Sequence, residues 1–136
     1  MPFILDNSVV MAWCFEETST PEAYRILDDA GSDEIAVPAV WPLEFGNALL
    51  VAERRGRIRH ADARRFVELV ASLPITVHES GVARALGPIL DLAHRYGLST
   101  YDASYLELAI HEGMALATFD ERLADAARQA GVPLIQ

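Results

Sequence analysis

The feature that most constrains the fold is the alternation of short apolar runs with longer segments of helical periodicity. The apolar runs are FIL (3–5), IAVP (35–38), ITV (75–77), ALAT (115–118) and PLI (133–135). Runs of this length suit buried strands, and the segments between them have the spacing of amphipathic helices. Alternating strands and helices indicate an α/β fold with a parallel sheet.

Proline and glycine mark the expected helix boundaries. Pro21 and Pro42 lie near helix starts, and glycines follow the expected helix ends at positions 31, 56, 97, 113 and 131. Pro88 interrupts segment 80–97, so we expect a kink or a break there. The chain has 136 residues, 51% of them hydrophobic, without repeats or low-complexity stretches, so residues 1–136 are expected to form one domain.

The charge composition excludes several function classes. All 11 basic residues are Arg, so mechanisms that need a lysine, such as P-loop phosphate binding, Schiff bases and lysine-dependent phospho-aspartate switches, are ruled out. The net charge of −9 argues against a broad basic surface for nucleic acid. No apolar stretch approaches the ~20 residues of a membrane span and no signal peptide is recognisable, so we expect a cytoplasmic protein without membrane contact.

Four acidic residues occupy equivalent positions at strand ends or in first helical turns. They are Asp6, Glu44, Asp102 and Asp120. Each alone is what a helix start prefers, as an Asx turn, an N-cap, a partner of the helix dipole, or, for Ser99 with Asp102, the spacing of a capping box. Together they are expected to converge, because the carboxyl ends of parallel strands meet in one crevice.

Convergence of four carboxylates requires a compensating charge. Two carboxylates 4 Å apart repel by about 4 kcal/mol at an effective dielectric near 20. No Lys exists and no Arg is expected next to these motifs, so a divalent cation, Mg²⁺ or Mn²⁺, is the expected partner of these hard oxygens. Zinc is disfavoured, because His60, His78, His94 and His111 lack i, i+4 spacing and the single Cys14 is expected to be buried. Such a metal suits phosphodiester hydrolysis, with Asp6 as a ligand and Ser8 orienting it or a water molecule.

Four stretches together resemble the PIN domain family, most closely the VapC-type toxins of bacterial toxin–antitoxin pairs. They are ILDNSVVMAWC, PLEFGNALL, LSTYDASYLELA and LATFDERLADAARQAGVPLI, and the resemblance spans essentially the whole chain. It implies one PIN-like domain whose parallel sheet, in the order 3-2-1-4-5, is flanked by helices. It also implies an acidic pocket of Asp6, Glu44, Asp102 and Asp120 that holds Mg²⁺ or Mn²⁺ and cuts RNA. Thr118 and Ser8 match the family's hydroxyls near the last and first acids.

The resemblance further implies a homodimer and a cognate VapB-type antitoxin. Asp120 could bind a second metal or act through water, and the number of metals stays open. Six Arg crowd into positions 54–65, either as a solvated helix end or as a patch for phosphates. Our hypothesis is that this cluster binds the RNA backbone through Arg54, Arg55, Arg57 and Arg59. The rings of Trp13, Phe15, Trp41 and Phe45 are expected in the core or at an interface rather than on bases.

Other functions fit less well. A nucleophilic-aspartate phosphotransferase would want a second acid two residues after Asp6, where Ser8 stands, and a receiver domain would need a late lysine. The remaining alternative is a PIN-like module that binds RNA or a regulator without cutting. Glu107, Glu121 and Asp125 are expected to be charges on helix surfaces.

Overall fold

The sheet is parallel and has the predicted order for its four strands. The computed structural model describes residues 1–15, 21–30 and 34–135. Its strands are β1 (Phe3–Leu5), β2 (Ile35–Pro38), β3 (Ile75–His78) and β4 (Ala115–Ala117), in the order β3-β2-β1-β4. β1 pairs with β2 through Phe3 opposite Ile35, and with β4 through Phe3 opposite Ala115. The predicted order is therefore correct for these four strands.

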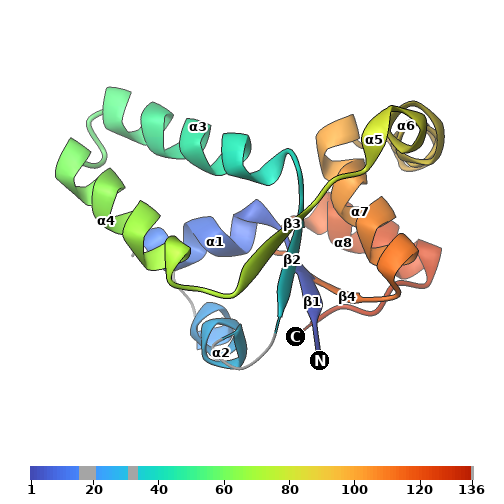
Figure 1. Cartoon of the computed structure of the whole chain (residues 1–136), viewed down its shortest axis with the longest axis horizontal. Coiled ribbons are helices and arrows are strands. Elements are labelled where there is room, and N and C mark those ends of the chain that lie inside the picture. The colour runs from blue at the N-terminus through green and yellow to red at the C-terminus, as the bar shows by residue number, and fades with distance from the viewer. Residues whose placement is uncertain (16–20, 31–33, 136) are drawn as a thin grey trace.

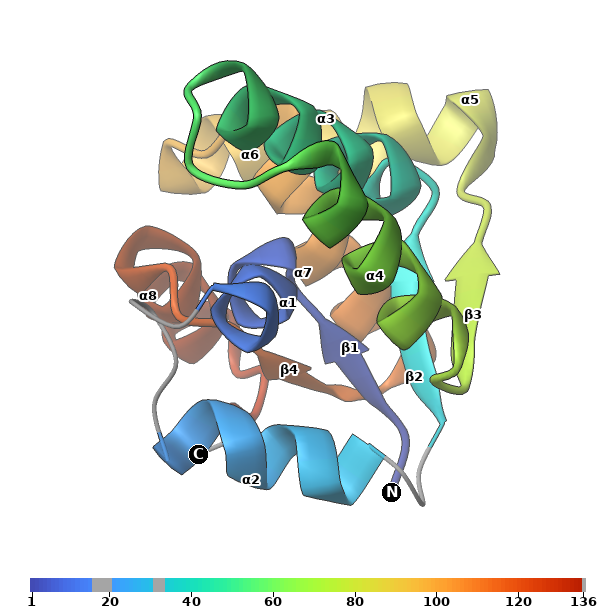
Figure 2. The ribbon, with the colours of Figure 1, turned by 90° about the vertical axis from the view of Figure 1, so that its left-hand side faces the viewer.

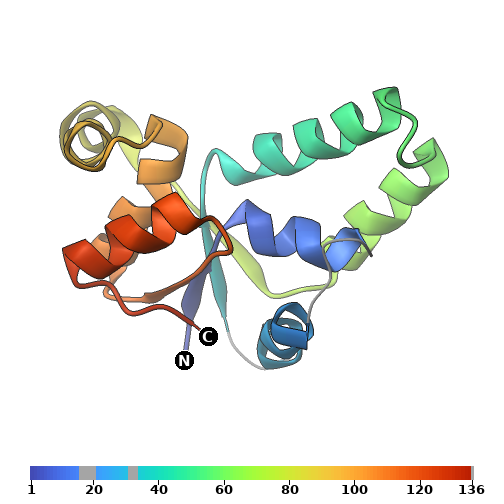
Figure 3. The same cartoon turned by 180° about the vertical axis from the view of Figure 1, so that it is seen from behind.

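The fifth expected strand, at 133–135, is reduced to a single bridge. Leu134 pairs in parallel with Leu116, flanked by two backbone hydrogen bonds of 2.9 Å, from Leu116 N to Pro133 O and from Ile135 N to Leu116 O. The segment that follows α8 runs back beside β4, in the place expected for this strand (Figure 3). Pro133 has no N–H to donate, which limits the pairing to one bridge.

Helices cover both faces of the sheet (Figures 1 and 2). One layer contains α1 (Asn7–Cys14), α2 (Pro21–Ala30), α3 (Trp41–Arg54) and α4 (His60–Ala71). The other contains α5 (Gly81–Arg84), the π-helical turn η2 (Ala85–Ile89), α6 (Leu90–Tyr96), α7 (Thr100–Glu112) and α8 (Glu121–Ala130). α3 and α4 form a hairpin that projects away from the sheet, whereas α7 packs directly on β1 and β2.

Most boundary signals act as expected. Pro42 lies in the first turn of α3, and Gly97, Gly113 and Gly131 end their helices in the left-handed conformation. Gly31 lies outside the residues that the structure describes. Pro88 lies in η2, which confirms the predicted break, because proline cannot donate the regular helical hydrogen bond.

The core confirms the expectations for the aromatic rings and the thiol. Trp41 and Phe45 stack with ring centroids 5.6 Å apart, and the indole N–H of Trp13 donates to the Ala23 carbonyl over 2.7 Å. Cys14 is buried, which raises the pKa of its thiol to about 12. Among the described residues, no helix is long and apolar enough to cross a membrane.

Candidate active site

The four predicted acids lie at the carboxyl edge of the sheet. Asp6 follows β1 as the N-cap of α1, and Asp120 follows β4 as the N-cap of α8. Glu44 lies in the first turn of α3, which follows β2, and Asp102 in the first turn of α7. For Asp6, Glu44 and Asp120, strand ends and helix starts coincide because the βα connections are short, whereas Asp102 comes from α7, which follows the helix α6.

Asp6 is the most enclosed of the four, with 5% of its surface exposed. Its Oδ2 accepts hydrogen bonds from the Ser8 hydroxyl (2.6 Å), the Thr118 hydroxyl (2.8 Å) and the Ser8 N–H (3.4 Å). Oδ1 accepts none from the described residues. Burial raises the pKa of Asp6, these hydrogen bonds oppose the rise, and the charge of Asp120 adds to it.

Ser8 and Thr118 join the ends of two neighbouring strands. Each hydroxyl donates its only hydrogen to Asp6 and accepts a backbone N–H, that of Phe119 for Ser8 (2.9 Å) and that of Asp120 for Thr118 (3.0 Å). Both hydroxyl hydrogens are thereby committed, which fixes Oδ2 of Asp6 and aligns the start of α8.

Glu44 is held by a tyrosine that sequence reasoning missed. The hydroxyl of Tyr105, a fully buried residue of α7, donates to Glu44 Oε1 over 2.7 Å. Burial raises the pKa of Glu44, and the charges of Asp6 and Asp102 raise it further. Tyr105 follows Asp102 by three residues, a helical spacing that places both on one side of α7 and could have revealed it.

Asp102 presents both carboxylate oxygens without a hydrogen bond from the described residues. Its backbone N–H donates to the Ser99 hydroxyl over 3.0 Å, so the capping predicted for this pair is present alongside the acid. Burial raises the pKa of Asp102, and Asp6 and Asp120 add to the rise. The guanidinium of Arg122 lowers the pKa of Asp102, so the expectation that no Arg lies next to the acidic motifs is wrong: Arg122 stands two residues after Asp120.

Asp120 has one oxygen engaged and one open. Its Oδ1 accepts the N–H groups of Arg122 (2.9 Å) and Leu123 (3.1 Å), as an N-cap does. Oδ2 accepts no hydrogen bond from the described residues. Each of the four acids thus keeps at least one carboxylate oxygen free, while hydrogen bonds anchor the other oxygen or the backbone.

The acids are electrostatically coupled without forming a finished metal cage. Asp6 interacts repulsively with each of the other three, and Asp102 also with Glu44 and Asp120. In the described ranges, no three His, Cys, Asp or Glu side chains are already arranged to hold a metal ion. The free oxygens are nevertheless hard, anionic and mutually repulsive, which is the donor chemistry that suits Mg²⁺ or Mn²⁺.

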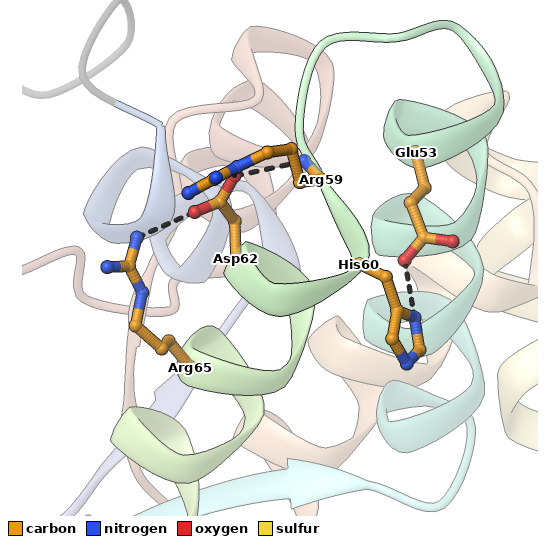
Figure 4. Close-up of polar contacts among 5 residues, drawn as sticks. All are labelled: Glu53, Arg59, His60, Asp62 and Arg65. Carbon is orange, nitrogen blue, oxygen red and sulfur yellow. Dashed lines mark hydrogen bonds and ion pairs between the residues drawn. The ribbon is translucent and has the colours of Figure 1, made fainter.

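The Arg cluster lies at the tip of the α3–α4 hairpin and is partly neutralised (Figure 4). Asp62 receives hydrogen bonds from Arg59 Nε (3.4 Å) and Arg65 Nη2 (2.7 Å), and the contacts of Arg59 hold the pKa of Asp62 below its usual range. His60 Nδ1 lies 3.0 Å from Glu53. The four Arg residues of the RNA hypothesis are all exposed, namely Arg54, Arg55, Arg57 and Arg59.

One expectation about the nearby acids is wrong. Glu107 is not a surface charge but is 5% exposed, and its carboxylate accepts hydrogen bonds from Nε (3.1 and 3.2 Å) and Nη2 of Arg84. Helical spacing alone placed Glu107 on the solvent side of α7. In the structure η2 packs against this part of α7, and Arg84 of α5 reaches the Glu107 carboxylate, so Glu107 is buried. Glu121 and Asp125 are exposed, as predicted.

Comparisons with known proteins agree on one family. The PIN domain model matches residues 3–129. Ribonuclease VapC3 of Pyrobaculum aerophilum is 28% identical over 92% of this chain and 94% of its own. The crystal structure of PAE2754 from the same organism superposes with a TM-score of 0.71 at 27% identity, covering 99% of this chain and 84% of that one. VapBC2 from Rickettsia felis, solved with a DNA fragment from their promoter, superposes with a TM-score of 0.69 at 14% identity over 98% and 97%.

Proposed function

The chain belongs to the PIN domain family, and on that premise we propose that it is a divalent-metal-dependent endoribonuclease, the toxin of a VapBC-type toxin–antitoxin pair. The observation that carries the proposal is the set of four coupled carboxylates at one sheet edge, each with a free oxygen. The ribonuclease names of relatives supply the reaction class. We take residues 1–136 as one catalytic domain.

The proposed site would hold Mg²⁺ or Mn²⁺ between Asp6, Glu44 and Asp102, with Asp120 as a further ligand or acting through water. When bound, the metal lowers the pKa of water and neutralises charge on the phosphate. Ser8 and Thr118 orient Asp6 by fixing its Oδ2, and Tyr105 orients Glu44. The remaining oxygens of these acids would have to move closer together to share a cation, because no three of the described acidic side chains are already arranged around one.

The partners follow from the same proposal. The substrate is RNA in the cytoplasm, and the cognate partner is a VapB-type antitoxin, supported by the likeness to VapBC2. A homodimer is the proposed assembly. Arg54, Arg55, Arg57 and Arg59 would contact the RNA backbone, because guanidinium groups bind phosphate oxygens bidentately.

The decisive experiment measures cleavage of a labelled single-stranded RNA by the purified protein. We expect cleavage with Mg²⁺ or Mn²⁺, loss of it in EDTA, and at least a hundredfold loss in Asp6→Asn, which removes the charge while retaining the shape. Asp91→Asn, an exposed acid in the first turn of α6, is the matched control and should cleave like the parent.

Two outcomes would contradict the proposal. Cleavage that survives both EDTA and Asp6→Asn comes from a contaminant. RNA binding without any metal-dependent cleavage favours the alternative, a PIN-like module that binds RNA or a regulator without cutting.

A further inference from the structure

A cavity of about 310 Å³ lies beside the acidic site, between the ends of β2 and β3, η2 and the first turn of α7. Val40 and Tyr101, which line it, adjoin the acids: the Val40 carbonyl accepts the N–H of Glu44 (3.1 Å), and Tyr101 directly precedes Asp102. The cavity therefore shares the β2–α3 connection and the first turn of α7 with Glu44 and Asp102, although neither acid lines it.

The walls of the cavity are mainly apolar. They include Pro38, Val40, Leu86, Ile89, Leu90 and Leu108. Tyr101 lies at the mouth with 61% of its surface exposed, so its ring is available for stacking. An apolar cavity with an accessible aromatic ring suits a flat, uncharged ring.

Two polar groups in the cavity lining have unused hydrogen-bonding capacity. The Nε2 atom of His78 is buried and has no hydrogen-bond partner within the described part of the chain. Its Nδ1 lies 3.5 Å from Glu112, so a neutral ring with its proton on Nδ1 would offer Nε2 as an acceptor. Arg84 uses Nε and Nη2 on Glu107, which leaves Nη1 as a donor. One acceptor and one donor on a common cavity match the polar edge of a base.

We propose that this cavity binds one unstacked nucleobase of the RNA substrate, next to the phosphodiester that is cut, with Tyr101 stacking on the base and His78 reading its edge. The inference rests on the proposed ribonuclease function and adds a specificity site to it. An apolar side chain of another protein would fill the walls but leave His78 Nε2 unpaired, whereas a base edge carries the missing N–H. Recognition of splayed single-stranded bases is the usual route to RNA specificity.

The test sequences the ends produced from a pool of randomised RNA octamers in Mn²⁺. The parent should show a base preference at one position flanking the cut. Tyr101→Ala and His78→Phe should each reduce that preference about tenfold, the usual size of a stacking or edge contact, without altering preferences elsewhere. Ile110→Ala is the matched control, because Ile110 is an exposed apolar residue of the same helix outside the cavity. Tyr101 is exposed, so its variant tests the proposal even if His78→Phe folds poorly.

A second arm replaces the preferred nucleotide by an abasic one. The parent should cleave the abasic RNA as slowly as Tyr101→Ala cleaves the intact RNA. Tyr101→Ala itself should cleave the two RNAs equally well. Cleavage without any base preference beside the cut, or a preference unchanged in both variants, overturns the inference and leaves the ribonuclease proposal standing. No cleavage by the parent overturns both. A change of molar mass in Tyr101→Ala with unchanged preference would mean that a second copy covers the cavity, which also overturns it.

Discussion

At the residue scale, Asp6 combines a structural and a chemical task that oppose each other. As the N-cap of α1 it accepts the Ser8 N–H, which stabilises the helix start. As a buried carboxylate near Asp120 it is held in a place that disfavours its charge, so its pKa is raised. Acidic residues whose pKa is shifted by burial and by a neighbouring charge are typical of functional sites, and Asp6 is one that also caps a helix.

Asp102→Asn should stabilise the metal-free protein. Because the folded-state pKa of Asp102 is raised above its ordinary value of 3.8, stability falls as pH rises from that value through the folded-state pKa, and the loss persists at neutral pH. Removing the charge should raise Tm in EDTA at pH 7 by a few degrees, and the gain should vanish below about pH 3.8. Calorimetry at both pH values measures this.

Adding Mg²⁺ should reverse that ranking. A bound ion stabilises the folded parent by mass action, so its Tm should rise with Mg²⁺ concentration while that of Asp102→Asn changes much less. Asp91→Asn should behave as the parent throughout. An equal response of all three proteins would argue against a metal site at these acids.

Tyr105→Phe tests the contact that orients Glu44. The variant keeps the ring in the core and removes the hydroxyl that donates to Oε1, so we expect about a tenfold loss of cleavage and a higher Mn²⁺ concentration for half-maximal activity. Tyr96→Phe, a half-buried tyrosine of α6, is the matched control. Loss of activity without any change in metal requirement would contradict a positioning role for Tyr105.

At the element scale, α7 organises much of the site. Asp102 lies in the first turn of α7, at the sheet edge, and the Tyr105 hydroxyl donates to Glu44. Glu107 of the same helix is buried against Arg84. The helix packs on β1, β2, β4, α6, η2 and α8. Packing on so many elements holds Asp102 at the sheet edge and Tyr105 against Glu44.

Arg84→Ala should destabilise the fold by about 2–3 kcal/mol, because it leaves the Glu107 carboxylate buried without its partner. We expect a smaller destabilisation than for a fully buried ion pair, because 24% of the Arg84 side chain is exposed to solvent. Urea unfolding measures it. Arg128→Ala, which breaks the exposed pair with Asp125, should cost well under about 1 kcal/mol. Equal costs for the two variants would show that burial does not matter here.

At the scale of the whole molecule, α3 links the acidic edge to the Arg-rich tip. Glu44 and Arg54 are ten positions apart on one helix, which corresponds to about 15 Å. The chain carries a net charge of −9, yet it concentrates cations on this projecting hairpin, away from the acids (Figure 1). A strand several nucleotides long could therefore contact both regions.

Replacing Arg54 and Arg55 together by Ala should weaken RNA binding and its salt dependence. If each contacts one phosphate, the slope of log Kd against log salt should fall by about 1.4, as expected for single strands. Arg59 and Arg65 are left in place because Asp62 already engages them. Fluorescence anisotropy in EDTA measures the slope, with Arg128→Ala as the control on α8. An unchanged slope would exclude Arg54 and Arg55 as phosphate contacts.

Much of the fold was predictable because its signals are local. Strand positions were predicted to within one residue for the four strands that form, since apolar runs between helix signals are short-range patterns. The fifth strand was overpredicted, because PLI has the composition of a strand but pairs at one position only. The strand order came from family resemblance, as pairing partners lie far apart in the sequence.

The sequence by itself determined that each of the four carboxylates would stand at or near a helix start, and three of them directly after a strand, because strand patterns and helix-start signals lie in neighbouring residues. Only the tertiary structure decided what surrounds them. Tyr105 reaches Glu44 across 61 positions, Thr118 reaches Asp6 across 112, and Arg84 meets Glu107 inside the packed helix layer. Such contacts depend on how helices and strands from distant parts of the chain pack, and burial, which sets the charge environment of each acid, exists only once they have packed.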